Sequence, residues 1–130
     1  MRVRFDPGPR RWSCAVAVLG LLLAPTPVRA HALLLESTPA DGATVAAAPP
    51  DLVLRFNSRI EHGLSKATLV AETDGRRSAL AVDANAPPDR FVCALPAALA
   101  PGRYTIEWQV LSVDGHRVAG KLGFAVSGPG

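Results

Sequence analysis

The segment Ser112-Val-Asp-Gly-His116 places a carboxylate and an imidazole two residues apart. In extended backbone, residues i and i+2 point the same way, so Asp114 and His116 could converge on one metal ion. The dipeptide Asp114-Gly115 is also typical of a hairpin turn, which would leave His116 on the surface. The two interpretations are compatible, since binding sites often lie on turns between strands.

A second candidate ligand, His31, follows a segment typical of an export signal. Four arginines precede a thirteen-residue apolar run, residues 12–24, and Val28 and Ala30 occupy the positions that a signal peptidase reads. The run is shorter than the roughly 20 residues that a membrane-spanning helix needs. The sequence therefore predicts a secretory signal peptide over residues 1–30, cleavage after Ala30, and a mature chain that begins at His31.

A mature N-terminal histidine offers two nitrogen donors, the α-amine and the imidazole Nδ1, which close a six-membered chelate around a metal ion. With the His116 imidazole and the Asp114 carboxylate, the donors are three nitrogens and one oxygen. This set favours copper(II), although zinc stays open because it also accepts imidazole and carboxylate. Copper(I) is disfavoured because the only methionine is Met1. We predict one copper(II) ion per mature chain, bound by His31, Asp114 and His116.

The remaining histidine and the two cysteines are not part of the predicted set of metal ligands. His62 lies in a polar segment after an apolar run and is predicted to be a surface residue. Cys93 is in step with Phe91 and Leu95, which predicts a small buried hydrophobic side chain rather than a reactive thiol. Cys14 lies in the signal peptide, so no internal disulfide is expected. No Ser-His-Asp spacing, phosphate loop or paired-carboxylate motif favours an enzyme.

Removal of the predicted signal peptide reverses the sign of the net charge. The whole chain has 14 basic and 11 acidic residues, but five of the basic residues and one of the acids lie within residues 1–30. The mature chain therefore carries nine basic and ten acidic residues, for a net charge of −1. Its composition gives no reason to expect a nucleic-acid partner.

Short alternating segments, separated by proline, glycine, asparagine and aspartate, predict an all-β domain over residues 31–126. The clearest is 103–110, where Tyr104, Ile106, Trp108 and Val110 share one face. The other predicted strands are 32–36, 52–56, 67–72, 79–83, 91–95 and 122–126. About seven antiparallel strands in this length indicate an immunoglobulin-like Greek-key sandwich, barrel-like in shape, with residues 127–130 as a flexible tail.

The sequence resembles the CopC family of periplasmic copper-binding and copper-resistance proteins. Residues 31–42, His-Ala-Leu-Leu-Leu-Glu-Ser-Thr-Pro-Ala-Asp-Gly, are similar to that family's mature amino terminus, and Leu-Arg-Phe-Asn at 54–57 to its second strand. Residues 101–116 and 120–126 resemble its carboxy-terminal half. The resemblance implies a small β-sandwich that binds copper(II) through His31, Asp114 and His116, and that acts as a chaperone or sequestering protein rather than an enzyme.

Two departures from the family pattern narrow these expectations. Some relatives carry a methionine-rich copper(I) site, which the mature chain lacks. Some carry a glutamate near the copper(II) site, shortly after the phenylalanine of the second strand, where Asn57 and Ser58 stand here. Whether Glu61 or His62 contributes instead is open.

Relatives are also fused to, or encoded with, a membrane copper-import partner, so the resemblance implies a separate membrane partner for this chain.

Three functions remain to be distinguished. The first is a periplasmic copper(II) carrier in copper resistance or homeostasis. The second is a copper oxidase resembling the polysaccharide mono-oxygenases, which also use an N-terminal histidine; this function requires an open coordination position and a substrate surface. The third is an immunoglobulin-type interaction module that binds no metal.

Overall fold

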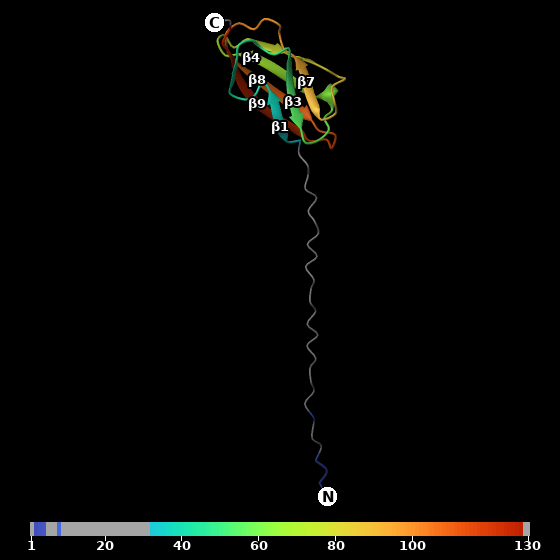
Figure 1. The fold of residues 1–130 in the computed structure, drawn as a ribbon. Helices are drawn as coiled ribbons and strands as arrows, with labels where there is room; N and C mark the ends of the chain where they lie inside the picture. The colour runs from blue at the N-terminus through green and yellow to red at the C-terminus, as the bar shows by residue number, and fades with distance from the viewer. Residues whose placement is uncertain (1, 5–7, 9–31, 129–130) are drawn as a thin grey trace.

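The computed structural model describes residues 2–4, 8 and 32–128 of the chain. Residues 32–128 form two β-sheets that pack face to face (Figure 1). One sheet has the strand order β1-β3-β7-β6 and the other β2-β9-β8-β4-β5. The strands are β1 (Leu34–Thr38), β2 (Ala43–Val45), β3 (Asp51–Phe56), β4 (Lys66–Ala71), β5 (Arg77–Ala79), β6 (Ala81–Val82), β7 (Arg90–Ala94), β8 (Gly102–Leu111) and β9 (Arg117–Val126). A short 3-10 helix, η1 (His62–Leu64), lies between β3 and β4.

The predicted all-β sandwich is confirmed, but the strands are more numerous than the sequence indicated. β2 has three residues and pairs in parallel with β9, so the prediction of a wholly antiparallel fold is wrong at this strand. The strand predicted at 79–83 is divided: β5 pairs with β4 in one sheet, and β6 pairs with β7 in the other. Leu80, between them, is buried where the chain crosses from sheet to sheet.

Strand β9 begins at Arg117, five residues before the predicted start, because it pairs with β8 along its full length, from Leu111↔Arg117 to Gly102↔Val126. The last two described residues, 127 and 128, lie against the end of β2 and in the folded part of the chain. The Ser127 amide donates to the carbonyl of Val45 at 2.8 Å, and Gly128 is buried. Residues 127 and 128 therefore belong to the folded domain, while 129 and 130 lie outside the described residues.

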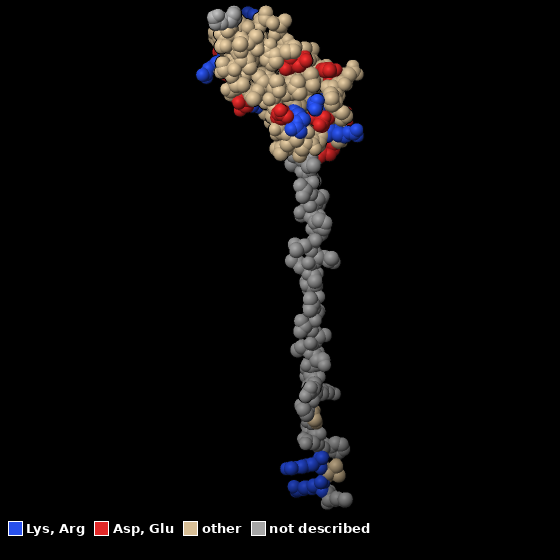
Figure 2. All heavy atoms as spheres, in the orientation of Figure 1, with Lys and Arg blue, Asp and Glu red and all other residues tan. Residues whose placement is uncertain are grey.

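The predicted signal peptide lies outside the described residues except for residues 2–4 and 8. Within the described part of the chain, no helix has the length and apolar character needed to cross a membrane. Figure 2 shows acidic and basic side chains of residues 32–128 interspersed on the face in view, next to wide areas of uncharged surface.

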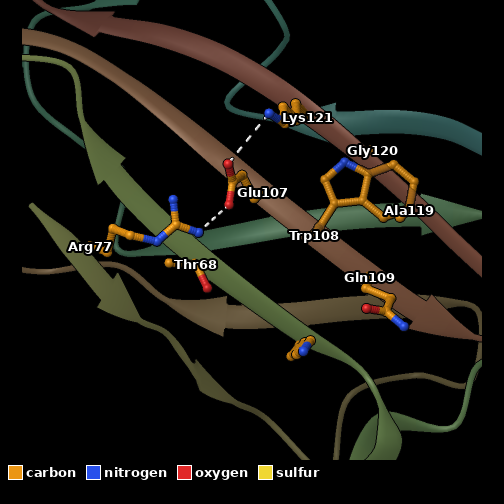
Figure 3. Close-up of a pocket in the computed structure, with 9 residues that line it drawn as sticks. Thr68, Arg77, Glu107, Trp108, Gln109, Ala119, Gly120 and Lys121 are labelled. Atoms are coloured by element: carbon orange, nitrogen blue, oxygen red, sulfur yellow. Dashed lines mark hydrogen bonds and ion pairs between the residues drawn. The ribbon is translucent and has the colours of Figure 1, made fainter. Parts of the chain in front are cut away.

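The outward face of β8 carries polar side chains that contact side chains of other strands in the same sheet. Glu107 lies between Arg77 of β5, with which it forms an ion pair, and Lys121 of β9, whose Nζ is 3.5 Å from Oε1 of Glu107 (Figure 3). The Arg77 hydrogen bond is the main reason that the pKa of Glu107 is lowered. These exposed pairs join three strands across one face of the sheet, and each contributes little to stability because water screens it.

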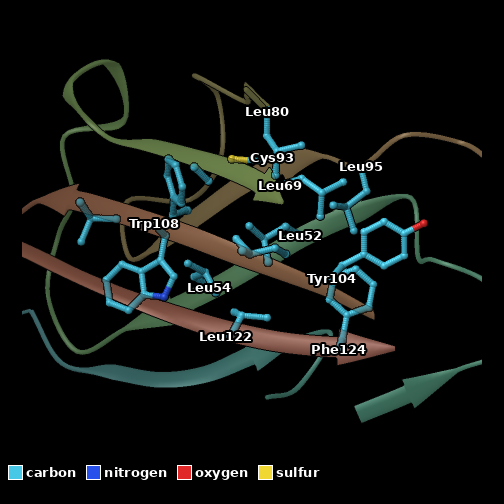
Figure 4. Packing of buried hydrophobic residues seen from close by; sticks show 14 of the residues in the cluster. Leu52, Leu54, Leu69, Leu80, Cys93, Leu95, Tyr104, Trp108, Leu122 and Phe124 are labelled. Carbon is cyan, nitrogen blue, oxygen red and sulfur yellow. The ribbon is translucent and has the colours of Figure 1, made fainter. Parts of the chain in front are cut away.

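The inward face of β8 supplies the centre of the core. Tyr104, Ile106, Trp108 and Val110 are all buried, as the alternating pattern predicts. Figure 4 shows side chains from both sheets meeting between the layers. The ring of Phe56 packs edge-on against Trp108 with centroids 5.5 Å apart. Trp108 and Tyr104 are thus core residues, as expected from the sequence.

Replacing Gly120 with alanine is expected to lower the free energy of unfolding by about 1–3 kcal/mol. The added Cβ would lie only 2.5 Å from Cζ2 of Trp108, whose ring crosses this position (Figure 3). Urea unfolding measures the loss. Gly63→Ala is the matched control, because no atom lies within 4 Å of a Cβ added there. Equal destabilisation by both substitutions would contradict a specific clash with Trp108.

Candidate metal centre

The segment from Ser112 to His116 is the turn that joins β8 to β9. The Ser112 amide donates to the carbonyl of His116 at 2.9 Å, and the Gly115 amide donates to the carbonyl of Ser112 at 2.9 Å. Gly115 has a φ of +87°, a conformation that glycine adopts without steric cost. Asp114-Gly115 therefore forms a hairpin turn, and the same turn carries both predicted metal ligands of the segment.

The Asp114 carboxylate is held by its own turn. Its Oδ1 accepts a hydrogen bond from the hydroxyl of Ser112 and another from the backbone amide of His116 at 3.1 Å. These bonds, with that of Ser112 foremost, lower the pKa of Asp114 from 3.8 to about 2. The side chain is thus an ionised, pre-oriented oxygen donor at any pH above about 4.

The second carboxylate oxygen faces the imidazole. Oδ2 of Asp114 lies 3.2 Å from Nδ1 of His116, and the two side chains are 40% and 34% exposed. Two donors about 2.0–2.1 Å from a metal and 90° apart would lie about 3 Å from each other. The observed separation of 3.2 Å therefore suits neighbouring ligands of a tetragonal copper(II) ion.

The third predicted ligand, His31, lies outside the described residues, but the structure describes the backbone that follows it. Ala32 is 2% exposed and belongs to the core. The Leu33 amide donates to Oδ1 of Asn57 at 2.7 Å, and the Asn57 amide donates to the carbonyl of Leu33 at 3.1 Å. This pair of bonds fixes the beginning of the domain beside the end of β3.

Residues 57–60, the bridging loop, connect this point to the β8–β9 turn. The Val113 amide donates to the carbonyl of Arg59 at 3.1 Å, and Ile60 forms a β-bridge with Ser112. In Figure 1, the entry of the chain into the domain, the tip of β3 and the orange-red turn after β8 lie at the same end of the sandwich. The structure thus brings the beginning of the domain and the Asp114–His116 turn to one end.

His62 has a structural contact that the sequence did not indicate. Its Nε2 lies 2.7 Å from the carbonyl of Arg90 and 3.2 Å from that of Pro87. Since both partners are acceptors, Nε2 carries a hydrogen and connects η1 to the start of β7. Glu61 is close to the turn through its backbone, because its amide donates to the carbonyl of Leu111 at 2.8 Å.

Cys93 is fully buried in the core, which confirms the prediction that it acts as a small hydrophobic side chain. Burial raises the pKa of the thiol to about 12. Thiolate is the form that binds metals and attacks electrophiles, so Cys93 is inert at neutral pH. Within residues 2–4, 8 and 32–128, no three His, Cys, Asp or Glu side chains gather into a metal-binding group.

Two residues whose hydrogen bonds hold this end of the molecule together were not predicted from the sequence. Ser112 and Asn57 act through hydrogen bonds to Asp114 and Leu33, respectively. The Ser112 contact is local and could have been inferred from a serine two residues before an aspartate, a spacing typical of polar turns. The Asn57 contact joins residues 24 positions apart and has no sequence signature.

The comparisons with known proteins agree with this architecture. Protein YobA of Escherichia coli (strain K12) is 35% identical over 113 residues, which cover 86% of this chain and 91% of YobA. Copper resistance protein C of Pseudomonas syringae pv. tomato is 33% identical over 104 residues, 75% of this chain and 82% of that protein. Copper transport protein CutJ of Bacillus subtilis (strain 168) is 25% identical over 117 residues, which cover 89% of this chain but 21% of CutJ.

Among solved structures, the crystal structure of CopC from Methylosinus trichosporium OB3b matches with a TM-score of 0.68 and 31% identity, covering 77% of this chain and 97% of that one. The family model for the CopC domain matches residues 34–127, which include both sheets and the β8–β9 turn. The chain belongs to the CopC family.

Proposed function

We propose that this protein binds one copper(II) ion at the β8–β9 turn and carries it in copper resistance or homeostasis. One observation supports this most directly: Oδ2 of Asp114 and Nδ1 of His116 face each other at 3.2 Å, on a turn that solvent reaches. A carboxylate oxygen and an imidazole nitrogen in neighbouring positions suit the tetragonal geometry of copper(II). The proposed role is binding and transfer of the ion, without catalysis.

His31 completes the proposed site with its α-amine and imidazole. Its peptide bond to Ala32 gives this ligand a rigid attachment, because Ala32 is buried and Leu33 is hydrogen-bonded to Asn57. The bridging loop contacts the turn that carries the other two ligands. Because the lone pair of a neutral amide nitrogen is delocalised into the carbonyl, the backbone nitrogen of His31 becomes a donor of the proposed chelate only after cleavage after Ala30. The proposal therefore includes export to the periplasm and removal of the signal peptide.

A separate membrane copper-transport partner is the proposed destination or source of the ion. The likeness to CutJ supports it, because there a segment similar to this chain makes up 21% of a copper transport protein. In CutJ the segment similar to this chain and the remainder of the protein belong to one polypeptide. Here the same two parts would meet as separate chains.

Copper(II) affinity is expected to fall steadily as the pH is lowered from 8 to 5. Protons compete with copper for the amine and imidazole nitrogens, whereas Asp114, with a pKa of about 2, stays ionised throughout this range. Competitive copper titrations of protein beginning at His31, at pH 5, 6, 7 and 8, measure the effect. Asp114→Ala should bind more weakly at every pH but with the same pH slope.

The same titrations test the proposal as a whole. One equivalent of copper(II) should bind, and zinc should compete only in excess, because copper(II) forms the more stable complexes with nitrogen donors. Binding that is independent of pH would exclude amine and imidazole ligands. Retention of no copper at pH 8 would exclude the proposed function.

A further inference from the structure

Ser112 is a buried polar residue beside the proposed ligands, and it is not itself a ligand. The residue is 1% exposed, and its hydroxyl donates to Oδ1 of Asp114. The backbone of Ser112 is used separately: its amide donates to His116, its carbonyl accepts from Gly115, and it forms a β-bridge with Ile60. Backbone hydrogen bonds within the turn and the β-bridge to Ile60 therefore hold Ser112 in position independently of its hydroxyl.

The hydroxyl determines which carboxylate oxygen of Asp114 is available. An aspartate side chain on an open turn rotates about two bonds, and its two oxygens exchange places by a half-turn of the carboxylate. Here Oδ1 receives two hydrogen bonds, from the Ser112 hydroxyl and from the His116 amide. Oδ2 is left facing Nδ1 of His116 at 3.2 Å. A single hydrogen bond from the His116 amide would leave the carboxylate able to rotate about that bond. The second hydrogen bond, from the buried Ser112 hydroxyl, restricts this rotation.

We infer that Ser112 is a positioning residue that holds Asp114 for coordination of copper(II) through Oδ2 alone. This inference rests on the proposed copper(II) function and extends it to a residue outside the ligand set. A ligand that is already oriented loses less conformational entropy when the metal binds. Groups that orient metal ligands by hydrogen bonding typically alter metal affinity 10- to 100-fold when they are removed.

The test is a double-mutant cycle of wild type, Ser112→Ala, Asp114→Ala and the double variant, all beginning at His31. Ser112→Ala should weaken copper(II) binding about tenfold. In the Asp114→Ala background the same substitution should change affinity less than about twofold, since Ser112 acts through that carboxylate. The electron paramagnetic resonance spectrum of copper-loaded Ser112→Ala should shift toward that of Asp114→Ala.

Thermal unfolding of the four metal-free proteins shows whether the turn is intact, and the cycle cancels any general loss of stability shared by the two backgrounds. Unchanged affinity in Ser112→Ala, or an equal loss with and without Asp114, would overturn the positioning role while leaving the copper site in place. Equal copper affinity of wild type and Asp114→Ala would instead contradict the proposed function, and the inference with it.

Discussion

Replacing His116 with alanine is expected to reduce copper(II) affinity at least about 100-fold while changing the free energy of unfolding by less than about 1 kcal/mol. The ring supplies one of three proposed nitrogen donors, and its loss leaves Asp114 without its neighbouring ligand. The stability effect is small because the side chain is 34% exposed on a turn and its contact with Asp114 is a surface interaction. Copper titration and urea unfolding of the same samples measure both effects.

His62→Ala is the matched control, because it removes the other histidine of the folded domain. We expect the opposite outcome: copper affinity within about threefold of wild type and a loss of about 1–2 kcal/mol in stability. The reason is that Nε2 of His62 donates to backbone carbonyls at 2.7 and 3.2 Å and joins η1 to β7. If His62→Ala lost copper as severely as His116→Ala, the ligand assignment would be wrong.

The second large effect concerns the amino terminus. Protein beginning at His31 whose amine is acetylated is expected to bind copper(II) at least about 100-fold more weakly than the same protein with a free amine. Acetylation converts the amine into an amide, as in the peptide bond of the uncleaved chain, and thereby removes one donor and the chelate ring that it closes with the imidazole. The folded domain should be unaffected, since Ala32 and Leu33 keep their core and backbone contacts.

Metal-free unfolding curves of the two forms provide the control and should superimpose. A third form in which His31 is replaced by alanine keeps the free amine and removes the imidazole, so it separates the two donors. Equal affinity and an identical copper spectrum in the acetylated form would show that the amine is not a ligand. The link between signal cleavage and copper binding would then be lost.

The sandwich was predictable where one strand face is buried along several residues. In β8, Tyr104, Ile106, Trp108 and Val110 alternate with polar residues over the length of the strand, and all four are buried. The start of β9 was not predictable in the same way. Residues 117–121 are strand because they pair with β8, although their own side chains are mostly exposed and show no apolar alternation.

The missed details depend on contacts between distant segments. β2 has too few residues to show a period, and it is strand because it lies beside β9. The division at Leu80 reflects a change of sheet that alternation over 79–83 does not reveal. In each case the tertiary environment, rather than the local pattern, determines the conformation.

In the candidate site, too, local features could be predicted from the sequence and contacts between distant segments could not. Asp114 and His116 could be proposed together because two residues of backbone separate them, and the structure brings their side chains to 3.2 Å. The role of the bridging loop could not be predicted, because its contacts with Leu33 and Val113 join residues far apart in the chain. His31 stays a prediction from the sequence and the family resemblance.

The most direct test of the central claim labels the proposed donors themselves. Protein beginning at His31, grown with histidine carrying ¹⁵N at every nitrogen and loaded with one equivalent of copper(II), would be measured by electron paramagnetic and electron–nuclear double resonance. Every nitrogen directly bound to copper should show the ¹⁵N pattern, because the amine and both imidazoles belong to His31 and His116. A strongly coupled ¹⁴N signal would reveal a nitrogen donor from another residue and contradict the proposed site.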